Sequence, residues 1–447
     1  MIRAAASIVA VFFLYFFGLT RTGLIGPDEA RYAAIGRVMA ATGDWITPRL
    51  WGQAWFEKPA LLYWMTAAGF KLGLGPDLAP RLPVALASVA FLVYFFLVLR
   101  RQFGDRAAWY ASAILATSAG WLVYSHFAIT DLPMSAAFAA AMLTILAPNP
   151  RAAIASGVLL GLAILAKGLV PLVLFIPALW FLRHRIRDLA ILFSAALLVA
   201  APWYILATLR NGTPFLEDLF WKHHFGRFFA SELQHGQPAW FYVPILLAGI
   251  FPWIPLLALL FNRQLYRDRR AQFLAVWIAW GFVFFSASHN KLPGYLLPLL
   301  PPLAALLGIA VSEIRARSPK LSALLAASAA LLCLVPALSN ALPQALAAGF
   351  SRTPLHLVTV WIAPVLLIAV LAAALERTNH RDCALAAVAI LTAVSVVTIV
   401  WRVYPRIDHQ LSGRASHAES ITCLPPTNRS QRYSIQYYAG RDVPDCK

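Results

Sequence analysis

Long blocks of apolar residues recur along this chain, separated by short polar segments. Typical blocks are 82–99, 189–209, 321–338 and 384–400. Each approaches the roughly 20 residues that an α-helix needs to cross the hydrocarbon core of a bilayer. Because backbone amides in lipid must be hydrogen-bonded within their own segment, we expect these blocks to be helices. The pattern therefore predicts an all-α polytopic membrane protein.

Basic residues form short clusters between the apolar blocks, as at Arg100-Arg101, Arg183–Arg187 and Arg263–Arg270. Short loops rich in Lys and Arg stay on the cytoplasmic side. When the loops with basic clusters are placed on the cytoplasmic side and the other loops on the periplasmic side, about thirteen transmembrane helices are predicted. The N-terminus is then cytoplasmic and the C-terminus periplasmic. The 152–182 region fits a tight hairpin of two half-length helices equally well. The expected spans are 4–24, 80–99, 107–126, 132–147, 152–165, 168–182, 189–208, 241–261, 271–288, 296–312, 321–338, 355–375 and 384–402.

The composition agrees with this interpretation and limits the partners. Only 13% of the residues are charged and 60% are hydrophobic, whereas a soluble protein carries about 25% charge. The net charge of +18 comes from the clusters between spans, and no basic stripe with interleaved aromatic residues lies outside them. We therefore expect membrane lipids with anionic headgroups as partners, and no nucleic acid.

The predicted topology divides the chain into a membrane domain and a tail. Residues 1–402 form the transmembrane domain, whose first periplasmic loop is 25–79 and whose second is 210–240. Residues 403–447 form a short, hydrophilic periplasmic tail. Such a tail is too short to bury much core unaided.

Two details of these external segments can be predicted further. In the first loop, Asp28–Ala41 and Pro59–Leu72 are expected to be short amphipathic helices lying in the membrane interface. In the tail, Cys423 and Cys446 would form a disulfide that staples it, provided that the tail is periplasmic.

Three carboxylates near the outer ends of the expected helices are candidates for function, because charge near a membrane is costly to keep. Asp28 and Glu29 follow the first span. Capping of the next helix explains one of them well and the second less well. Asp131 lies alone between two apolar spans, where it would serve equally well as an N-cap.

Cations accompany these acids at the same predicted face. Lys58 follows Glu57, and this pair is either a surface ion pair of little energetic value or part of a phosphate site. Lys167 is either a snorkelling lysine or a phosphate ligand. Lys291 and Tyr295 are four residues apart and would share one face of a helix that begins there, forming a phosphate cradle.

The second loop contains His223, His224 and Arg227. Two adjacent histidines suggest a metal, but neighbouring side chains point apart on a helix. A zinc site needs further ligands, which Glu57 or Asp131 could supply only through a tertiary contact. Arg227 is a candidate for anion binding.

Seven motifs follow one another in order through residues 1–310. They are Gly26–Tyr32, Gly43–Pro48, Phe56–Trp64, Ala128–Asp131, Leu165–Gly168, His223–Arg227 and Lys291–Tyr295. Together they resemble the aminoarabinose lipid A transferase (ArnT-like) proteins, which are related to the protein O-mannosyltransferases. The resemblance implies the type-C glycosyltransferase fold, for which thirteen spans are expected. The tail is much shorter than the external domain of the best-known members, which leaves the acceptor open.

The resemblance also implies roles for individual residues. Asp28 would be the central acid of the site, and we assign catalysis to Asp28, Glu29 and Asp131. Some family members bind zinc near the position of Glu57, so a zinc site of Glu57, His223 and His224 is retained, and no other cofactor is expected. The expected contacts to substrate and carrier phosphate are Glu57, Lys58, Lys167, Arg227, Lys291 and Tyr295.

The function implied is transfer of a sugar, with 4-amino-4-deoxy-L-arabinose as a candidate, from a polyprenyl-phosphate carrier. The acceptor would be lipid A-like or another envelope molecule at the periplasmic face of the bacterial inner membrane, and the reaction an inverting single displacement. Asp28 would act as general base toward a hydroxyl acceptor, or would steady the sugar if the acceptor is an ionised phosphate. A protein O-mannosyltransferase-like enzyme is the alternative. A secondary transporter or flippase is less favoured, because the charges gather at one face and no repeated halves are evident.

Overall fold

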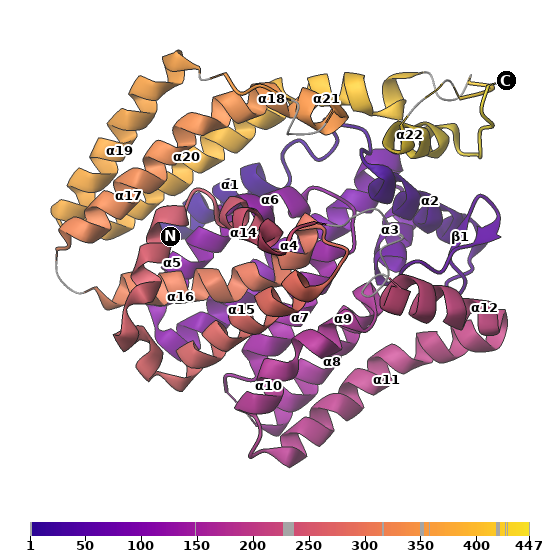
Figure 1. Cartoon of the computed structure of the whole chain (residues 1–447), viewed down its shortest axis with the longest axis horizontal. Helices are drawn as coiled ribbons and strands as arrows, with labels where there is room; N and C mark the ends of the chain where they lie inside the picture. The colour runs from indigo at the N-terminus through magenta and orange to yellow at the C-terminus, as the bar shows by residue number, and fades with distance from the viewer. Residues whose placement is uncertain are drawn as a thin grey trace.

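Helices form most of the computed structural model (Figure 1), which describes residues 2–147, 149–226, 237–314, 317–348, 353–356, 358–416, 421–424, 426 and 428–446. Within these residues the only sheet is a hairpin of β1 (Arg49–Leu50) and β2 (Gln53–Ala54), in which Leu50 pairs with Gln53. The predicted all-α class is therefore confirmed.

The first half of the chain contains the two helices expected in the first loop, α2 and α3. The elements of this half are α1 (Ile2–Tyr15), α2 (Pro27–Thr42), α3 (Leu61–Lys71), α4 (Gly75–Phe103), α5 (Asp105–Ala116), α6 (Ala119–Ser125), α7 (Asp131–Thr144), α8 (Pro150–Lys167), α9 (Val170–Leu174), α10 (Ile176–Phe181), α11 (Ile186–Asn211), α12 (Thr213–Leu216) and η1 (Glu217–Gly226).

The second half continues the bundle and ends in the tail. Its elements are η2 (Ala239–Phe241), α14 (Tyr242–Ile250), η3 (Ile254–Phe261), η4 (Arg263–Arg267), α15 (Arg269–Ala287), η5 (Pro293–Leu299), α16 (Leu300–Glu313), α17 (Pro319–Leu331), η6 (Leu332–Leu334), α18 (Val335–Ala348), η8 (Thr359–Trp361), α19 (Ile362–Arg377), α20 (Arg381–Arg402), α21 (Tyr404–Leu411), η9 (Gly413–Ser416) and α22 (Arg429–Ala439).

Among the described residues, eight helices are long and apolar enough to cross a membrane. The count is nine if α14 and η3, between which the chain bends by 110°, form one span. Every one of the thirteen expected spans contains helix, but several are short or broken. The expected span 107–126, for example, is divided between α5 and α6. The multi-pass architecture is confirmed, whereas the count of thirteen crossings stays a prediction.

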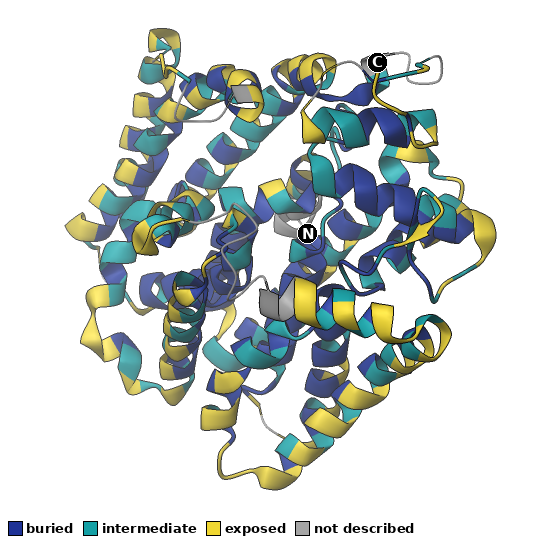
Figure 2. Ribbon diagram, turned by 45° about the vertical axis from the view of Figure 1, so that its right-hand side comes forward, coloured by how far each residue is buried: buried dark blue, intermediate teal, exposed yellow. Residues whose placement is uncertain are grey.

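The helices differ in what they face. The span Pro293–Glu313 is 94% buried, so it is central, whereas the span of α11 is only 22% buried. Figure 2 shows exposed residues along such peripheral helices, and Leu198 and Leu209 of α11 are more than three-quarters exposed. In water these side chains would be a liability, but in lipid their exposure costs nothing, because the solvent is itself apolar.

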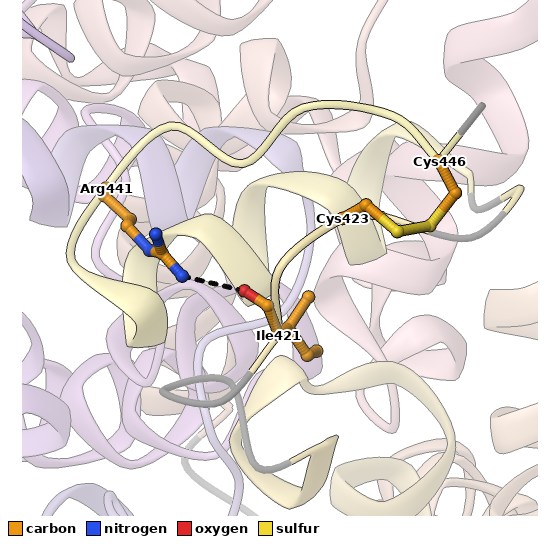
Figure 3. The surroundings of a disulfide bond; sticks show 4 residues. All are labelled: Ile421, Cys423, Arg441 and Cys446. Carbon is orange, nitrogen blue, oxygen red and sulfur yellow. Dashed lines mark hydrogen bonds between the residues drawn. A yellow bond between two sulfur atoms is a disulfide. The ribbon is translucent and has the colours of Figure 1, made fainter.

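The tail folds back onto the end of the bundle that carries α2 and α3 (Figure 1). Tyr438 of α22 donates to Asp77 Oδ1 at 2.5 Å and accepts the Leu24 amide at 2.9 Å. Cys423 and Cys446, the pair predicted from the sequence, form a disulfide. Figure 3 shows it closing the loops on either side of α22, beside the Arg441–Ile421 hydrogen bond. A segment with little core of its own is therefore held by the helices beneath it.

Candidate active site

The candidate site begins where α2 begins. Gly26 has φ +79°, a conformation that glycine adopts without strain, and Pro27 occupies the first turn, where its lack of an amide proton costs nothing. The first turn then presents Asp28 and Glu29. Because adjacent helical residues point in different directions, the two carboxylates meet different surroundings.

Asp28 lies at the surface of a cavity and pairs with a buried arginine of its own helix. Its side chain is 46% exposed, and its Oδ1 contacts Nη2 of Arg31, one turn later. The Arg31 guanidinium also lies 2.8 Å from Glu57 Oε2, and both of these side chains are 4% exposed. Arg31 thus bridges the first motif of the loop to the third.

The surroundings of Arg31 hold it in its charged form. The rings of Trp55 and Tyr433 lie 5.4 and 5.2 Å from the guanidinium carbon, within cation–π range. Burial opposes the charge, but the neighbouring Glu57 and Asp28 outweigh it, so the pKa of Arg31 is raised above its ordinary value. Arg31 therefore stays a cation at any pH at which the protein works.

Glu29 is not part of this cavity, which corrects its assignment to catalysis. The carboxylate is 1% exposed and binds Arg81 of α4 through both oxygens, at 2.8 and 2.9 Å. It also accepts the amides of Ala128 and Ile25. With its oxygens occupied in this way, Glu29 ties α2 to α4 and positions its neighbour Asp28.

The third predicted acid forms a second polar cluster. Asp131 Oδ1 lies 2.6 Å from Lys167 Nζ, and this ammonium lies 4.6 Å from the centre of the Tyr295 ring. Gly294 allows the approach, since a Cβ there would lie only 2.5 Å from Asp131 Oδ1. Residues from α7, α8 and η5 therefore meet at one point.

The other two predicted lysines have different surroundings. Lys58 is 12% exposed, and its Nζ lies 3.7 Å from Glu57 Oε1, beside the Asp28–Arg31–Glu57 cluster. Lys291 is buried, and its Nζ donates to the carbonyls of Ser288 at 2.5 Å and Gln237 at 3.2 Å. Lys291 therefore braces the segment before η5, which places Tyr295.

A cavity of about 680 Å³ extends from the Asp28–Arg31–Glu57 cluster to Tyr295. Of the predicted residues, Asp28, Glu57 and Tyr295 line it. Asp131 and Lys167 are not among its lining residues, and Lys167 is connected to it only through its contact with the Tyr295 ring. Segments far apart in the sequence thus converge on a single hollow. It has the polar groups and the room that a sugar or a phosphate requires.

The predicted metal site lies partly outside the described residues, and one predicted anion ligand lies wholly outside them. Arg227 lies outside the described residues, as do the side chains of His223 and His224. The described residues contain no group of three metal-ligating side chains. Glu57 already has Arg31 and Lys58 beside it, and this positive charge does not fit a bound cation. The zinc site stays a prediction.

Four charged residues that line the cavity were not among the predicted site residues. One of them is Arg31. Its position three residues after Asp28 on a helix is a signal that could have identified the ion pair. Asp218 and Lys222 of η1 also line the cavity and lie 3.5 Å apart. Arg429 reaches it from α22, and nothing in the local sequence of the tail predicted that contact.

Comparison with known sequences agrees with this geometry. Residues 57–206 match the family described as Dolichyl-phosphate-mannose-protein mannosyltransferase. An undecaprenyl phosphate-alpha-4-amino-4-deoxy-L-arabinose arabinosyl transferase of Pseudomonas aeruginosa (strain UCBPP-PA14) is 34% identical over 68% of this chain and 59% of its own. That of Serratia proteamaculans (strain 568) is 33% identical over 74% of this chain and 64% of its own. The chain thus spans less than two thirds of the length of these relatives.

Comparison with solved structures extends the likeness to nearly the whole chain. The crystal structure of ArnT from Cupriavidus metallidurans bound to undecaprenyl phosphate superposes with a TM-score of 0.77 and 26% identity, covering 98% of this chain and 85% of that one. The archaeal oligosaccharyltransferase AglB from Archaeoglobus fulgidus, at a TM-score of 0.54 and 13% identity, shares the fold alone. The type-C membrane fold expected from the motifs is therefore confirmed.

Proposed function

We propose that this chain, which belongs to the ArnT-like family of membrane glycosyltransferases, transfers a sugar from a polyprenyl-phosphate carrier to an envelope acceptor. The single observation that carries the proposal is the cavity in which the half-exposed Asp28, clamped by Arg31, faces Tyr295 of the Asp131–Lys167 cluster. A phosphate leaving group, a sugar and an acceptor need this combination of a positioned acid with nearby cations.

Asp28 is the residue that we place at the reacting carbon. Arg31 holds its carboxylate in one orientation, and the exposed edge of Asp28 faces the cavity. Toward a hydroxyl acceptor, this carboxylate is the general base that removes the proton during attack. Toward an already ionised phosphate acceptor, it stabilises the sugar as positive charge develops on the anomeric carbon.

The departing phosphate requires cations, and two positions supply them. Lys58 lies beside Glu57, which lines the cavity, and Lys167 lies against the ring of Tyr295, which also lines it. The guanidinium of Arg227 is the third cation that we assign to this task. Preorganised cations of this kind stabilise the charge that grows on a leaving group. The displacement is a single inverting step, in which the acceptor oxygen replaces the phosphate oxygen.

We infer the location of the cavity from the charge distribution of the loops. We place it at the periplasmic face of the bacterial inner membrane, with the N-terminus in the cytoplasm and the tail in the periplasm. Two facts support this: the basic clusters lie in the loops at the opposite ends of the spans, and the tail contains a disulfide, a bond typical of oxidising compartments.

The donor sugar is 4-amino-4-deoxy-L-arabinose in our proposal, and the acceptor is a lipid A-like molecule. The names of the similar transferases support this sugar. The match to the mannosyltransferase family over residues 57–206 favours a second candidate, transfer of a sugar to protein.

Reconstitution into proteoliposomes distinguishes these functions. Purified protein is incubated with an undecaprenyl-phosphate-linked aminoarabinose donor, a lipid A acceptor and a secretory protein acceptor, and the products are analysed by mass spectrometry. We expect sugar on the lipid only, and none with the Asp28→Asn variant. Sugar on the protein would favour the second candidate. Transport of the intact donor across the bilayer without transfer would contradict both.

A further inference from the structure

A second cavity, also of about 680 Å³, lies between the hairpin of the first loop and helix α22 of the tail. Leu50, Trp51 and Gln53 line it from the hairpin, and Arg432 and Gln436 line it from α22. Neither the predicted site residues nor the proposed transfer reaction assigns a role to this cavity.

This second cavity adjoins the one that contains Asp28. Gln53, Trp55 and Arg429 line both of them. A molecule in the second cavity would therefore lie directly beside the reacting groups, on the side formed by the tail. The polyprenyl carrier does not match this cavity. A polyprenyl chain needs an apolar surface, and most of the residues that line the cavity are polar.

The charge of the lining favours an anion. Arg429 has no carboxylate partner among the described residues, and its guanidinium lies 5.9 Å from the Tyr433 ring. Arg432 pairs with Asp445 at 3.1 Å, but these side chains are 40% and 67% exposed, and such a pair is weak and readily exchanged. Asp442 also lines the cavity and accepts from Gln436 Nε2 at 2.6 Å. Two arginines thus face one acid.

The neutral groups of the lining favour a sugar. Indole Nε1 of Trp51 and Oε1 of Gln436 are buried and have no hydrogen-bond partner in the described part of the chain. Gln436 itself is only 2% exposed. A donor and an acceptor left in this state are costly without a partner, and a sugar hydroxyl can pair with either once the side chain turns toward the cavity. The rings of Trp51, Trp55 and Tyr433 supply the apolar faces on which a sugar ring packs.

The backbone of the hairpin gives an independent sign of function. Trp51 and Gly52 form its two-residue turn, with φ angles of +49° and +81°. A turn with two positive φ values favours Asn-Gly or Asp-Gly, and a bulky residue with positive φ is uncommon. Strain of this kind is found where a side chain is needed in a particular place, which here is the wall of the cavity.

From these observations we infer that the hairpin and α22 form the acceptor subsite, which binds an anionic sugar. The anion lies against Arg429 and Arg432, and the ring lies against Trp51 and Trp55. This inference rests on the proposed function, because it identifies the molecule in the second cavity as the one that receives the transferred sugar. The tail, through Arg429 and Arg432, then determines acceptor choice.

The test measures direct binding of sugar probes to the purified protein in detergent. Ligand-observed NMR detects the binding. The probes are glucose 1-phosphate, glucuronate and neutral glucose, with undecaprenyl phosphate titrated separately. The variants are Arg429→Gln/Arg432→Gln and Trp51→Asn, the latter placing a favourable residue in the turn so that the hairpin is kept. The matched control is Arg406→Gln, which removes an exposed arginine of α21 that does not line the cavity.

We expect an anionic probe to bind at least about tenfold more tightly than glucose, since hydrogen bonds to charged groups are the stronger ones. The double arginine variant should lose about tenfold or more in this affinity, Trp51→Asn several-fold, and Arg406→Gln less than about twofold. The tighter of the two anionic probes identifies phosphate or carboxylate as the recognised group.

Other outcomes separate this inference from the proposed function. Unchanged binding of the anionic probes by Arg429→Gln/Arg432→Gln would overturn the subsite. The subsite would also be overturned if the wild-type protein bound undecaprenyl phosphate but none of the sugar probes. In that case the proposed function would survive. If sugar binds and undecaprenyl phosphate does not, the proposed function fails, and with it the role of the cavity in accepting a transferred sugar.

Discussion

Asp28 and Glu29 are neighbours in the sequence, and each pairs with an arginine, yet they belong to opposite kinds of site. Glu29 is 1% exposed, and its partner Arg81 is 2% exposed. Asp28 is 46% exposed and faces a cavity. One residue along a helix turns a side chain by about 100°, and here that rotation separates a buried ion pair from one that borders the cavity.

The two arginines show what each pair is for. All five N–H groups of Arg81 are used, on both oxygens of Glu29 and on the carbonyls of Leu19, Thr22 and Gly23. Such complete satisfaction is what a buried ion pair needs to be tolerated. Arg31 instead serves two acids, Asp28 and Glu57, and leaves one edge of Asp28 open. The first pair therefore stabilises the loop that the second pair uses.

The largest effect is expected from Asp28→Asn. The variant keeps the shape of the side chain and loses its charge, so turnover in proteoliposomes should fall by roughly 10²- to 10⁴-fold, the usual contribution of a general base. Its thermal unfolding midpoint in detergent should stay close to that of the wild type. A large loss of stability in this variant would mean that the two acids are not distinct in role.

The next largest effect is expected from Arg81→Met. The variant leaves Glu29 buried without its partner, and breaking such a pair costs about 3–5 kcal/mol. Thermal or denaturant unfolding in detergent measures this loss. Adding Glu29→Gln should recover part of it, because the charge is then removed as well. Normal stability of the single variant would show that the Glu29–Arg81 pair does not hold the loop.

Arg31→Lys should have an intermediate effect and one that is confined to activity. A lysine keeps the charge but, as a point charge, cannot bridge Asp28 and Glu57 as the planar guanidinium does. We expect turnover to fall by about 10- to 100-fold, with little change in unfolding. Wild-type turnover would show that the bridge does not orient Asp28.

The same variant should change the pH profile. Glu57 and Asp28 together raise the pKa of Arg31, so the wild-type cation persists as pH rises, and this group causes no alkaline decline. The lysine variant should lose its remaining activity only at alkaline pH, above the ordinary lysine pKa of about 10.4, because the same two carboxylates raise the pKa of a lysine at this position. Identical alkaline limbs in the two proteins would argue against the bridge.

The smallest effect is expected from Arg414→Gln, in a cluster that is intermediate in burial. Arg414 binds Asp77 at 2.9 Å and Asp408 at 2.5 Å, but its side chain is 32% exposed. Pairs of this exposure contribute up to about 1 kcal/mol, so we expect a small fall in unfolding midpoint and faster proteolysis of the tail. Arg406→Gln is the control. If Arg414→Gln lost as much stability as Arg81→Met, the exposure of an ion pair would not predict how much that pair contributes to stability.

Much of the architecture was predictable because it depends on local patterns. The apolar blocks led to the helices of the bundle, and α2 and α3 were found close to their expected bounds. The motif residues Asp28, Glu57 and Tyr295 were expected to meet, and they line one cavity. Single positions escaped this reasoning. The sequence pattern grouped Glu29 with Asp28 as a catalytic acid, whereas the structure buries it against Arg81.

What the order of residues determined was therefore the set of helices, the side of each helix that is apolar, and the collection of polar groups placed at their ends. Hydrophobic periodicity and motif spacing extend over only a few turns, so they carry this information locally. Packing decided the rest. The neighbours of α2 set which of two adjacent acids meets Arg81 and which meets the cavity, and the tail added Arg429 and Tyr433. Those contacts join residues far apart in the sequence, by 52 positions for Glu29 and Arg81 and by much more for the tail, and their geometry depends on how all the helices fit together.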